Sequence, residues 1–266
     1  MIRAHLQRIT VYPIKSLEGV SVNRIKVAPG GALEHDREFA VLDGEGNFVN
    51  GKRNPKVHLI RSSSDLKAER VTLRIPGERE PVTCHLDHDR VKLEGRLGNF
   101  FGFPVKLSQN RAEGYPDDTE ASGPTVISAA TLREVASWFE GLGEHDMRLR
   151  FRANLEIEGA PAFWEDRLFG DPGTVMAFQI GDVRMEGVRP CRRCVVPTRD
   201  PVTAEIYPEF QKTFMEKRRE TFPPSAAVSR FNHFYRLCVN TRIPASESGK
   251  FLKVGDEVKI IGSKQF

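Results

Sequence analysis

Short runs that alternate apolar and polar residues fill the first hundred positions and constrain the fold most strongly. VSVNRIKV alternates, FAVLDGEGNFV divides into two strands at a Gly-rich turn, and KVHLIRS, RVTLRI, PVTCHL and RVKLEG follow at short spacing. A period of two is typical of half-buried strands, and many short strands without intervening helices predict an antiparallel barrel or sandwich. We expect a short helix in this half only around LGNFFGF.

The second half adds helices to the strand pattern. The polar run over residues 111–124 predicts a linker or an active-site loop. SAATLREVASWFEGLG then predicts a helix capped by Ser128, and PEFQKTFMEKRRETF predicts another. RLRFRANLEIEG alternates strictly, which predicts a strand up to Ile157 with arginines on one face. FYRLCVNTRI and KFLKVGDEVKIIG predict the closing strands, so we expect a mixed, β-rich protein with a few peripheral helices.

Charge and hydropathy argue against several classes of protein. The formal net charge is +4 and the pI is near 8.9 without a Lys/Arg-rich block, so a local anion site fits better than nucleic acid binding. The first residues, MIRAHLQRITVYPIKS, lack the apolar centre of a signal peptide. No apolar run approaches the roughly 18 residues of a transmembrane helix. Four cysteines are too few for a secreted disulfide scaffold. We expect a cytoplasmic protein with reduced thiols and no membrane partner.

The stretch RPCRRCVVPTRDP places Cys191 and Cys194 in a C-x-x-C spacing. A structural zinc usually needs four ligands, but Cys84 and Cys238 are isolated and no H-x₃₋₅-H pair follows. A thioredoxin-like dithiol lies between a strand and a helix, and VVPTRDP is a poor helix start. From spacing alone, two buried thiols near a turn are favoured over both alternatives.

Positive charge around the two cysteines argues for more than packing. The neighbouring arginines are Arg189, Arg192, Arg193 and Arg199. Nearby cations favour the thiolate, which is the form that binds a metal or acts as a nucleophile. The alternating run upstream adds a cationic face at Arg148, Arg150 and Arg152, for which a solvated edge with ion pairs is an equally good explanation.

Four motifs occur in one order along the chain: VYPIKSLEGVSV, HDREFAVLD, RFRANLEIEG and RPCRRCVVPTRDP. This ordered set resembles the MOSC family, in which a molybdenum cofactor sulfurase C-terminal domain is preceded by an N-terminal β-barrel domain. In pattern the chain is most similar to the amidoxime-reducing component and its bacterial homologues. The resemblance extends from Tyr12 to LKVGDEVKII. It implies a β-barrel-like N-terminal domain over residues 1–115 and a MOSC β-barrel domain with the cysteine motif over residues 116–266.

The resemblance also implies a molybdopterin-type cofactor with the thiolate of Cys194 on molybdenum. Six further residues are implied as cofactor contacts: Lys15, Ser16, Arg37, Ser122, Arg152 and Asn154. Arginine forks and hydroxyl or amide donors suit the oxygens of a phosphate. A soft thiolate suits an oxo-molybdenum centre that already carries the two sulfurs of the cofactor.

Three of these contacts have a structural alternative. Lys15 would be a surface lysine after a strand, Arg37 would pair with Asp36 or Glu38, and Asn154 would satisfy an irregular strand. The resemblance favours a cofactor contact for both cations and leaves Asn154 open.

The chain departs from the family pattern at two places. The run NGKRNP has Asn50 and Lys52 where relatives carry Thr and Arg, which puts a cofactor contact there in doubt. The run PTRDP stands where relatives often show TTVDP, so substrate selection is expected to differ. The chain has neither four clustered cysteines nor room for a desulfurase domain, so we expect no Fe–S cluster and no PLP on it.

The resemblance predicts an oxidoreductase in which molybdenum cycles between Mo(VI) and Mo(IV) and removes oxygen from N-hydroxylated or related small molecules. Electrons would come from a separate protein, such as a ferredoxin or a flavin reductase. Cys194 would hold the metal and Asp200 would donate a proton, although a turn role in RDP explains Asp200 more simply. The alternative is a non-catalytic carrier of molybdenum cofactor or sulfur that uses Cys194. A polar cleft over the metal would favour the enzyme, and an exposed thiol in a shallow groove the carrier.

Overall fold

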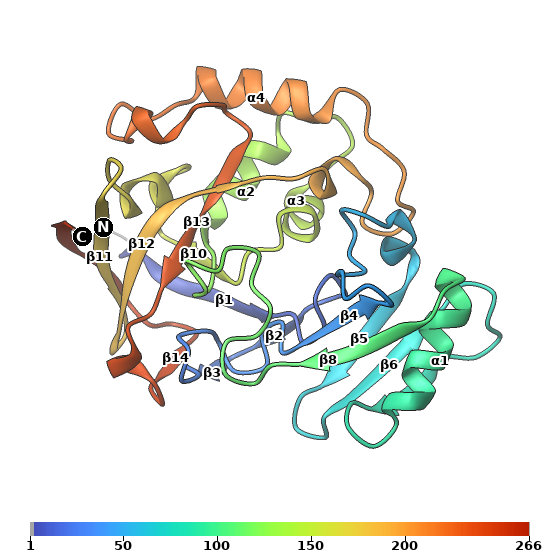
Figure 1. Ribbon diagram of the computed structural model, residues 1–266. Helices are drawn as coiled ribbons and strands as arrows, with labels where there is room; N and C mark the ends of the chain where they lie inside the picture. The colour runs from blue at the N-terminus through green and yellow to red at the C-terminus, as the bar shows by residue number, and fades with distance from the viewer. Residues whose placement is uncertain (1–2, 266) are drawn as a thin grey trace.

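The computed structural model describes residues 3–265 and contains one large sheet (Figure 1). In spatial order its strands are β15 (Val258–Gln265), β11 (Thr174–Ile180), β12 (Val183–Arg192), β13 (Arg236–Arg242), β9 (Val126–Ser128), β10 (Leu155–Glu158), β1 (His5–Val11) and β2 (Val20–Val22). Neighbours are antiparallel except for β9 and β10, which are parallel. The N-terminal strands β1 and β2 therefore extend a sheet that is otherwise built by the second half of the chain.

Smaller sheets and one helix form the other end of the molecule (Figure 1). The paired strands there are β4 (Phe39–Asp43) with β8 (Val105–Gln109), and the meander β5 (Arg61–Asp65), β6 (Arg70–Arg74) and β7 (Val82–His85), which α1 (Arg90–Phe101) follows. A further pair joins β3 (Arg24–Lys26) to β14 (Phe251–Lys253). The predicted β-rich fold with few helices is confirmed, and no sheet within residues 3–265 closes into a barrel. The division at residues 115 and 116 stays a prediction.

Helices α2 (Ala129–Ala136), α3 (Glu144–Phe151) and α4 (Phe210–Glu220) pack around an aromatic cluster that includes Phe151, Phe210 and Phe214. Both helices predicted for the second half are confirmed. Ser128 caps α2 as expected, because its hydroxyl accepts the N–H of Ala130 at 3.2 Å. Short 3₁₀ turns are η1 (Pro55–Leu59), η2 (Trp164–Leu168), η3 (Val196–Thr198), η4 (Val228–Arg230) and η5 (Ala245–Glu247). None of the helices described in residues 3–265 combines the length and apolar character needed to cross a membrane.

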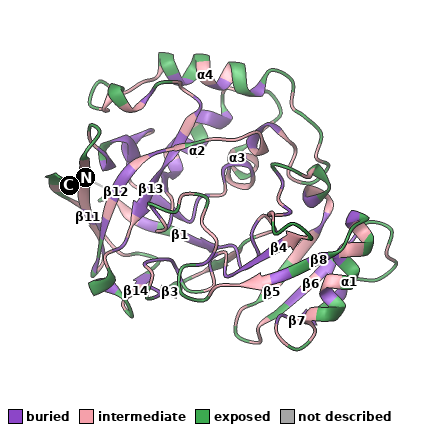
Figure 2. Cartoon of the chain, in the orientation of Figure 1, coloured by how far each residue is buried: buried purple, intermediate pink, exposed green. Residues whose placement is uncertain are grey.

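Two larger hydrophobic cores lie on either side of the segment that follows β1. Ile9 and Val11 belong to the core of the eight-stranded sheet, whereas Ile14 and Leu17 belong to the core between the smaller sheets and α1. Figure 2 shows that buried backbone runs along β1 and continues toward β4. Residues 12–16 are thus fixed at both ends by apolar packing, at the junction of the two cores.

The predicted strand up to Ile157 is wrong in its first part. Residues 144–151 form α3, Arg152 takes the left-handed region with φ 53°, and only β10 is extended. Alternation over a few residues does not distinguish a strand from a short helix. Here Arg148 pairs with Glu144 one turn earlier at 2.6 Å, which supports the helix. The run RVKLEG, also expected as a strand, forms the first half of α1, so the helix predicted around LGNFFGF begins earlier than expected.

A buried charge cluster fastens α4 to the 3₁₀ turn η2. Arg218 is 1% exposed, pairs with Asp166, and lies with its Cζ 4.2 Å from the ring centroid of Phe163. The adjacent Glu165 accepts a hydrogen bond from the hydroxyl of Thr131 at 2.9 Å. Burial, followed by the charge of Asp166, raises the pKa of Glu165 to about 8. Glu165 therefore carries a proton at neutral pH.

Because folded Glu165 holds a proton at neutral pH, we expect the free energy of unfolding to fall as pH rises. Between its usual pKa and about 8 the folded chain retains a proton that the unfolded chain has lost, so each pH unit in that window reduces the free energy of unfolding by about 1.4 kcal/mol at most. Glu165→Gln should remove this slope. Urea unfolding at pH 5, 6, 7 and 8 measures it, with the exposed Glu216→Gln as the control. A constant stability difference between wild type and Glu165→Gln at all four pH values would contradict the account.

Candidate functional site

Three segments that are distant in the sequence meet where β1 ends (Figure 1). They are the turn at residues 12–16, the turn at residues 35–37, and residues 152–154 after α3. The N–H of Arg37 donates to the carbonyl of Tyr12 at 2.7 Å, and the N–H of Tyr12 donates to the carboxylate of Asp36 at 2.9 Å. The hydroxyl of Tyr12 donates to the carbonyl of Ala153 at 3.4 Å. Tyr12 therefore touches both of the other segments.

Asn154 lies fully buried at the centre of this junction. Its amide nitrogen donates to the carbonyl of Thr10 at 3.0 Å. Its amide oxygen accepts the N–H of Thr125 at 3.1 Å and a guanidinium N–H of Arg37 at 3.4 Å. These bonds match the structural alternative given for Asn154, and the same side chain also orients Arg37, whereas a cofactor contact by Asn154 stays a prediction. Thr125 was not singled out in the sequence, where nothing distinguishes it from other β-branched residues.

Two of the predicted cations lie against the ring of Tyr12. The Cζ of Arg152 is 4.1 Å from the ring centroid and that of Arg37 is 5.5 Å. One guanidinium nitrogen of Arg152 donates a hydrogen bond to the carbonyl of Leu17 at 2.6 Å. Arg37 pairs with Asp36 at 2.5 Å, as one of the structural alternatives expected. Nearly all of Tyr12 is buried, and burial raises its pKa to about 12 despite both arginines, so the phenol is neutral.

Lys15 is buried, so the structural alternative of a plain surface lysine is wrong, and the expected cofactor contact stays a prediction. The residue is 7% exposed, and its Nζ donates to the carbonyl of Tyr115 at 2.9 Å and pairs with Asp117 at 2.5 Å. Burial lowers the pKa of Lys15, and the charge of Asp117 opposes that effect. The side chain of Asp117 is itself 82% exposed. A buried cation is therefore neutralised by a carboxylate that stays open to solvent.

The backbone around these side chains is unusual. Ser16, Arg37 and Arg152 have φ of 74°, 51° and 53°, in the left-handed region that residues with a Cβ rarely adopt. Such conformations persist only where the surroundings enforce them, and they concentrate at functional sites. Three of the six residues expected to contact a cofactor thus share this strained conformation.

The cysteine motif lies at the end of β12 and is fastened to the same junction. Arg193 donates to the sulfur of Cys191 at 3.2 Å and to the carbonyl of Phe151 at 2.8 Å, one residue before Arg152. Arg193 is next to Cys194 in the sequence, and its guanidinium hydrogen-bonds the sulfur of Cys191. Cys191 packs against the aromatic cluster, as a small hydrophobic residue would, and Cys194 is partly exposed. Both are free thiols.

A second contact joins the turn at residues 50–53 to residues 193–201, the loop after β12 that we call the cysteine loop. Arg199 donates to the carbonyl of Gly51 at 2.5 Å. Burial, with the positive charges of Arg199 and Arg152, lowers the pKa of His58 to about 4, so this imidazole is neutral at pH 7. His58 therefore lies beside Arg199 and Arg152 without adding a charge of its own. Lys52, at the position in doubt, is exposed.

Asp200 and Ser122 make contacts that suit structural roles. The carboxylate of Asp200 accepts the N–H groups of Val202 and Thr203, both at 2.8 Å, as a turn residue does. Partial burial acts to raise the pKa of Asp200, but these amides lower it overall, which disfavours a proton donor. The hydroxyl of Ser122 donates to the carbonyl of Gly30 at 3.3 Å. A cofactor contact by Ser122 stays a prediction.

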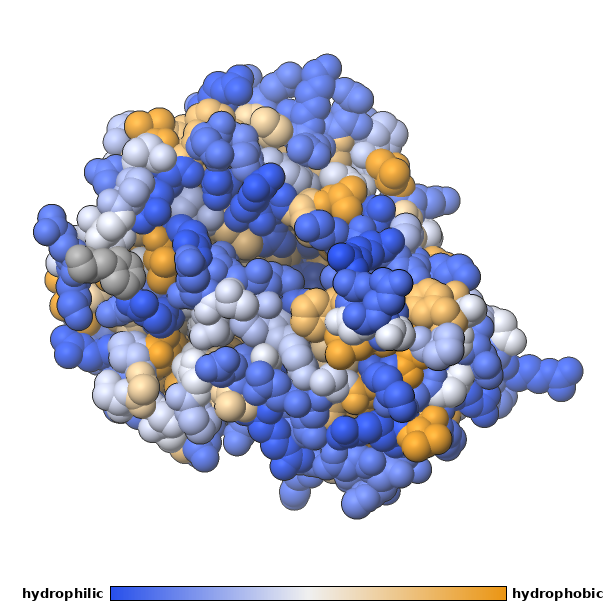
Figure 3. Space-filling view, viewed as in Figure 1, coloured by the Kyte–Doolittle hydropathy of each residue, from blue (hydrophilic) through white to orange (hydrophobic). Residues whose placement is uncertain are grey.

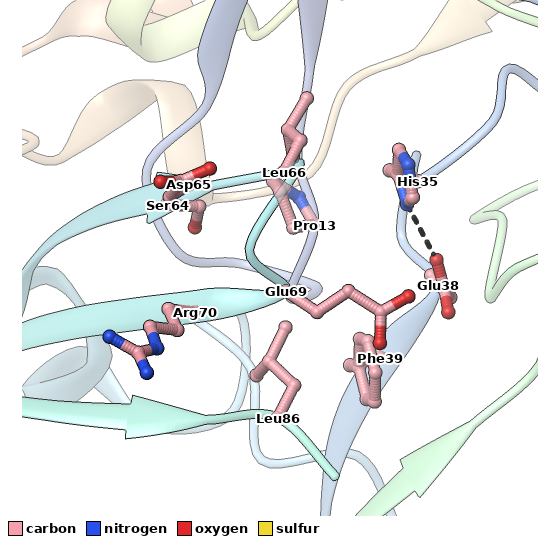
Figure 4. Close-up of a pocket in the computed structure, with 10 residues that line it drawn as sticks. All are labelled: Pro13, His35, Glu38, Phe39, Ser64, Asp65, Leu66, Glu69, Arg70 and Leu86. Carbon is pink, nitrogen blue, oxygen red and sulfur yellow. Dashed lines mark hydrogen bonds and ion pairs between the residues drawn. The ribbon is translucent and has the colours of Figure 1, made fainter.

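The surface of the molecule is hollowed near the middle of the face shown in Figure 3, and hydrophilic side chains dominate the rim. A groove of about 610 Å³ lies between α4 and the cysteine loop. It is lined in part by Val195, Thr198, Tyr207 and Phe210. A cavity of about 10 Å³ beside the 35–37 turn has room for no more than a water molecule. Figure 4 shows His35, one of the residues that line this cavity, pointing toward Glu38; its Nδ1 is 3.0 Å from Oε2 of Glu38.

No zinc site is formed by the cysteine motif. Residues 3–265 contain no group of three or more His, Cys, Asp or Glu side chains that is arranged to hold a metal ion. The two cysteines alone supply fewer protein ligands than a structural zinc requires.

Comparison with known proteins matches both halves of the chain. The family described as the MOSC N-terminal beta barrel domain matches residues 3–142, and the MOSC domain matches residues 121–259. Mitochondrial amidoxime reducing component 2 of Bos taurus is 24% identical over 95% of this chain and 82% of its own length. Mitochondrial amidoxime-reducing component 1 of Homo sapiens is 24% identical over 96% and 82%.

A second kind of relative is matched only in part. Molybdenum cofactor sulfurase of Homo sapiens is 26% identical over 79% of this chain, which spans 28% of the length of that protein. Each of the two family matches covers just over half of the chain, and the relatives are linked by name to amidoxime reduction or to the molybdenum cofactor. The chain therefore belongs to the MOSC family of proteins related to the molybdenum cofactor.

Proposed function

We propose that this chain binds the molybdenum cofactor at the junction beside the cysteine loop and acts as a molybdenum-dependent oxidoreductase. One observation carries the proposal: Lys15, Arg37 and Arg152 come from separate segments, gather at one junction, and are joined to the cysteine motif through Arg193. The similarity to amidoxime reducing components supports N-hydroxylated or related oxygenated small molecules as substrates.

The residues at the junction fit an anionic, thiolate-ligated group. The carboxylate of Asp117, an anion of the chain itself, pairs with Lys15. A phosphate could bind the same buried cation from the solvent side. The Nε of Arg193 is buried without a hydrogen-bond partner among the described residues, which leaves one donor near the cysteines unused. Cys194 offers a free, partly exposed thiol. Charge, donors and a soft ligand are therefore present together.

When bound, the cofactor would supply two-electron chemistry that removes oxygen from the substrate. This chain would supply binding and orientation. Lys15 and Arg37 would hold phosphate oxygens, Arg152 would add a third cation, and the thiolate of Cys194 would ligate the metal. Asn154 would fix Arg37 through its amide oxygen. The proposal that Asp200 donates a proton rests on the sequence alone. The contacts of its carboxylate in the structure support a turn residue instead.

We also propose that electrons reach the site from a separate protein, such as a ferredoxin or a flavin reductase. The motif set that resembles amidoxime reducing components supports this proposal. The cytoplasmic location predicted from the sequence is part of the same proposal.

The proposed function makes a prediction about metal content. Protein from a host that makes molybdopterin should contain close to one molybdenum per chain, and protein from a host that cannot make it should contain none. Arg152→Ala should lower occupancy because it removes a charge-assisted contact of roughly 1.5–3 kcal/mol. Arg133→Ala, which removes a surface ion pair with Glu158, is the matched control. One zinc per chain and no molybdenum from either host would rule the proposal out.

A further prediction of the proposed function separates the two cysteines by turnover. Loaded Cys194→Ser should lose all reduction of N-hydroxylated substrates with a strong artificial donor. Cys191→Ser should keep most activity, because a hydroxyl can still accept the hydrogen bond from Arg193. The reverse pattern would assign the ligand to Cys191. Equal loss in both, with a disulfide that forms and breaks during turnover, would support the dithiol alternative. Loaded wild type that is inert toward N–O and S–O substrates would support the carrier.

A further inference from the structure

We propose that Tyr12 is a positioning residue of this site: its ring holds the guanidinium groups of Arg37 and Arg152 in place as one paired cationic surface for a phosphate. The inference rests on the proposed function and deepens it, because it explains how two like charges are kept side by side before any anion arrives.

The arrangement of the two arginines requires such a partner. Arg152 lies 4.1 Å and Arg37 lies 5.5 Å from the same ring centroid, measured to Cζ. Because both guanidinium groups lie against one ring, their like charges repel each other; burial lowers the pKa of Arg152, and the charge of Arg37 lowers it further. The face of an aromatic ring attracts cations and offsets part of that repulsion. Asp36 neutralises Arg37 by a direct pair, whereas Arg152 makes its hydrogen bond to the carbonyl of Leu17.

The ring itself is held rigidly. Tyr12 is 4% exposed, and its backbone N–H and carbonyl bind Asp36 and Arg37, so the ring and the arginine turn move as one unit. The chain also passes over the ring at Gly19. A Cβ added to Gly19 would lie 2.6 Å from Cγ2 of Thr10, and 2.7 Å from Cε1 and 2.9 Å from Cδ1 of Tyr12, closer than real side chains approach. A glycine at this position therefore leaves space that the ring occupies.

The ring, and not the hydroxyl, carries the role. The hydroxyl makes a long bond of 3.4 Å to the carbonyl of Ala153. With a pKa raised to about 12 by burial, the phenol does not ionise near neutral pH and supplies no charge to the arginines. Phenylalanine should therefore replace tyrosine with little loss, and an aliphatic residue should not.

The test measures binding of inorganic pyrophosphate to cofactor-free protein from a host that cannot make molybdopterin, by isothermal titration calorimetry. Tyr12→Leu should weaken binding about tenfold, as expected for the loss of a buried cation–π contact. Tyr12→Phe should restore binding to within about twofold of wild type. Phe178→Leu is the matched control, because it removes a buried ring from the core that also contains Ile9 and Val11. It should lower the melting temperature without changing the affinity.

A second variant keeps the inference testable if Tyr12→Leu does not fold. Gly19→Ala retains every functional side chain but presses against both the Thr10 methyl and the Tyr12 ring, so it should also weaken pyrophosphate binding. Unchanged affinity in Gly19→Ala and Tyr12→Leu, or equal weakening in Phe178→Leu, would overturn the role of Tyr12. Molybdenum per chain in wild type is measured separately. Full loading in wild type together with unchanged pyrophosphate binding in the variants would contradict this inference alone, whereas no loading in wild type would contradict the proposed function.

Discussion

The buried side chain of Asn154 is the interaction on which the site depends. Its amide bonds to Thr10 on the first strand, to Thr125 before β9 and to Arg37 on a separate turn, so it joins three parts of the chain without any contact with solvent. A buried amide that lost these partners would cost about 1–3 kcal/mol for each unsatisfied group. The position of Arg37 is therefore tied to a buried amide that also bridges β1 and the segment before β9.

The positive charges of the lysine and arginines at this junction need nearby negative charge. The chain provides it for some of these cations and not for others. Asp36 pairs with Arg37 and Asp117 pairs with Lys15, but Arg152 relies on a ring and a carbonyl, and Arg193 on a carbonyl and a sulfur. A buried cation without a full counter-charge is costly, so the site gains stability when an anion arrives. This imbalance, next to a free thiol, is the physical basis of the proposed cofactor site.

The sequence predicted the strand-rich architecture, both helices of the second half and the cap at Ser128, because these depend on local periodicity. It failed at residues 148–151, where the start of the alternating run forms the end of a helix that ion pairs of Arg148 with Glu144 and Glu156 stabilise. Within the site it indicated Lys15, Arg37 and Arg152 through motifs. The contacts of Tyr12, Thr125 and Asp117 were not predictable, since they join residues more than twenty positions apart.

The most direct test of the account is molybdenum K-edge X-ray absorption of the loaded protein and its two cysteine variants, which counts the sulfur atoms bound to the metal. We expect wild type and Cys191→Ser to show one protein sulfur on molybdenum in addition to those of the cofactor. In Cys194→Ser this protein sulfur should be absent. The same sulfur count in Cys194→Ser as in wild type, or a loss confined to Cys191→Ser, would contradict the assignment of Cys194 as the protein ligand.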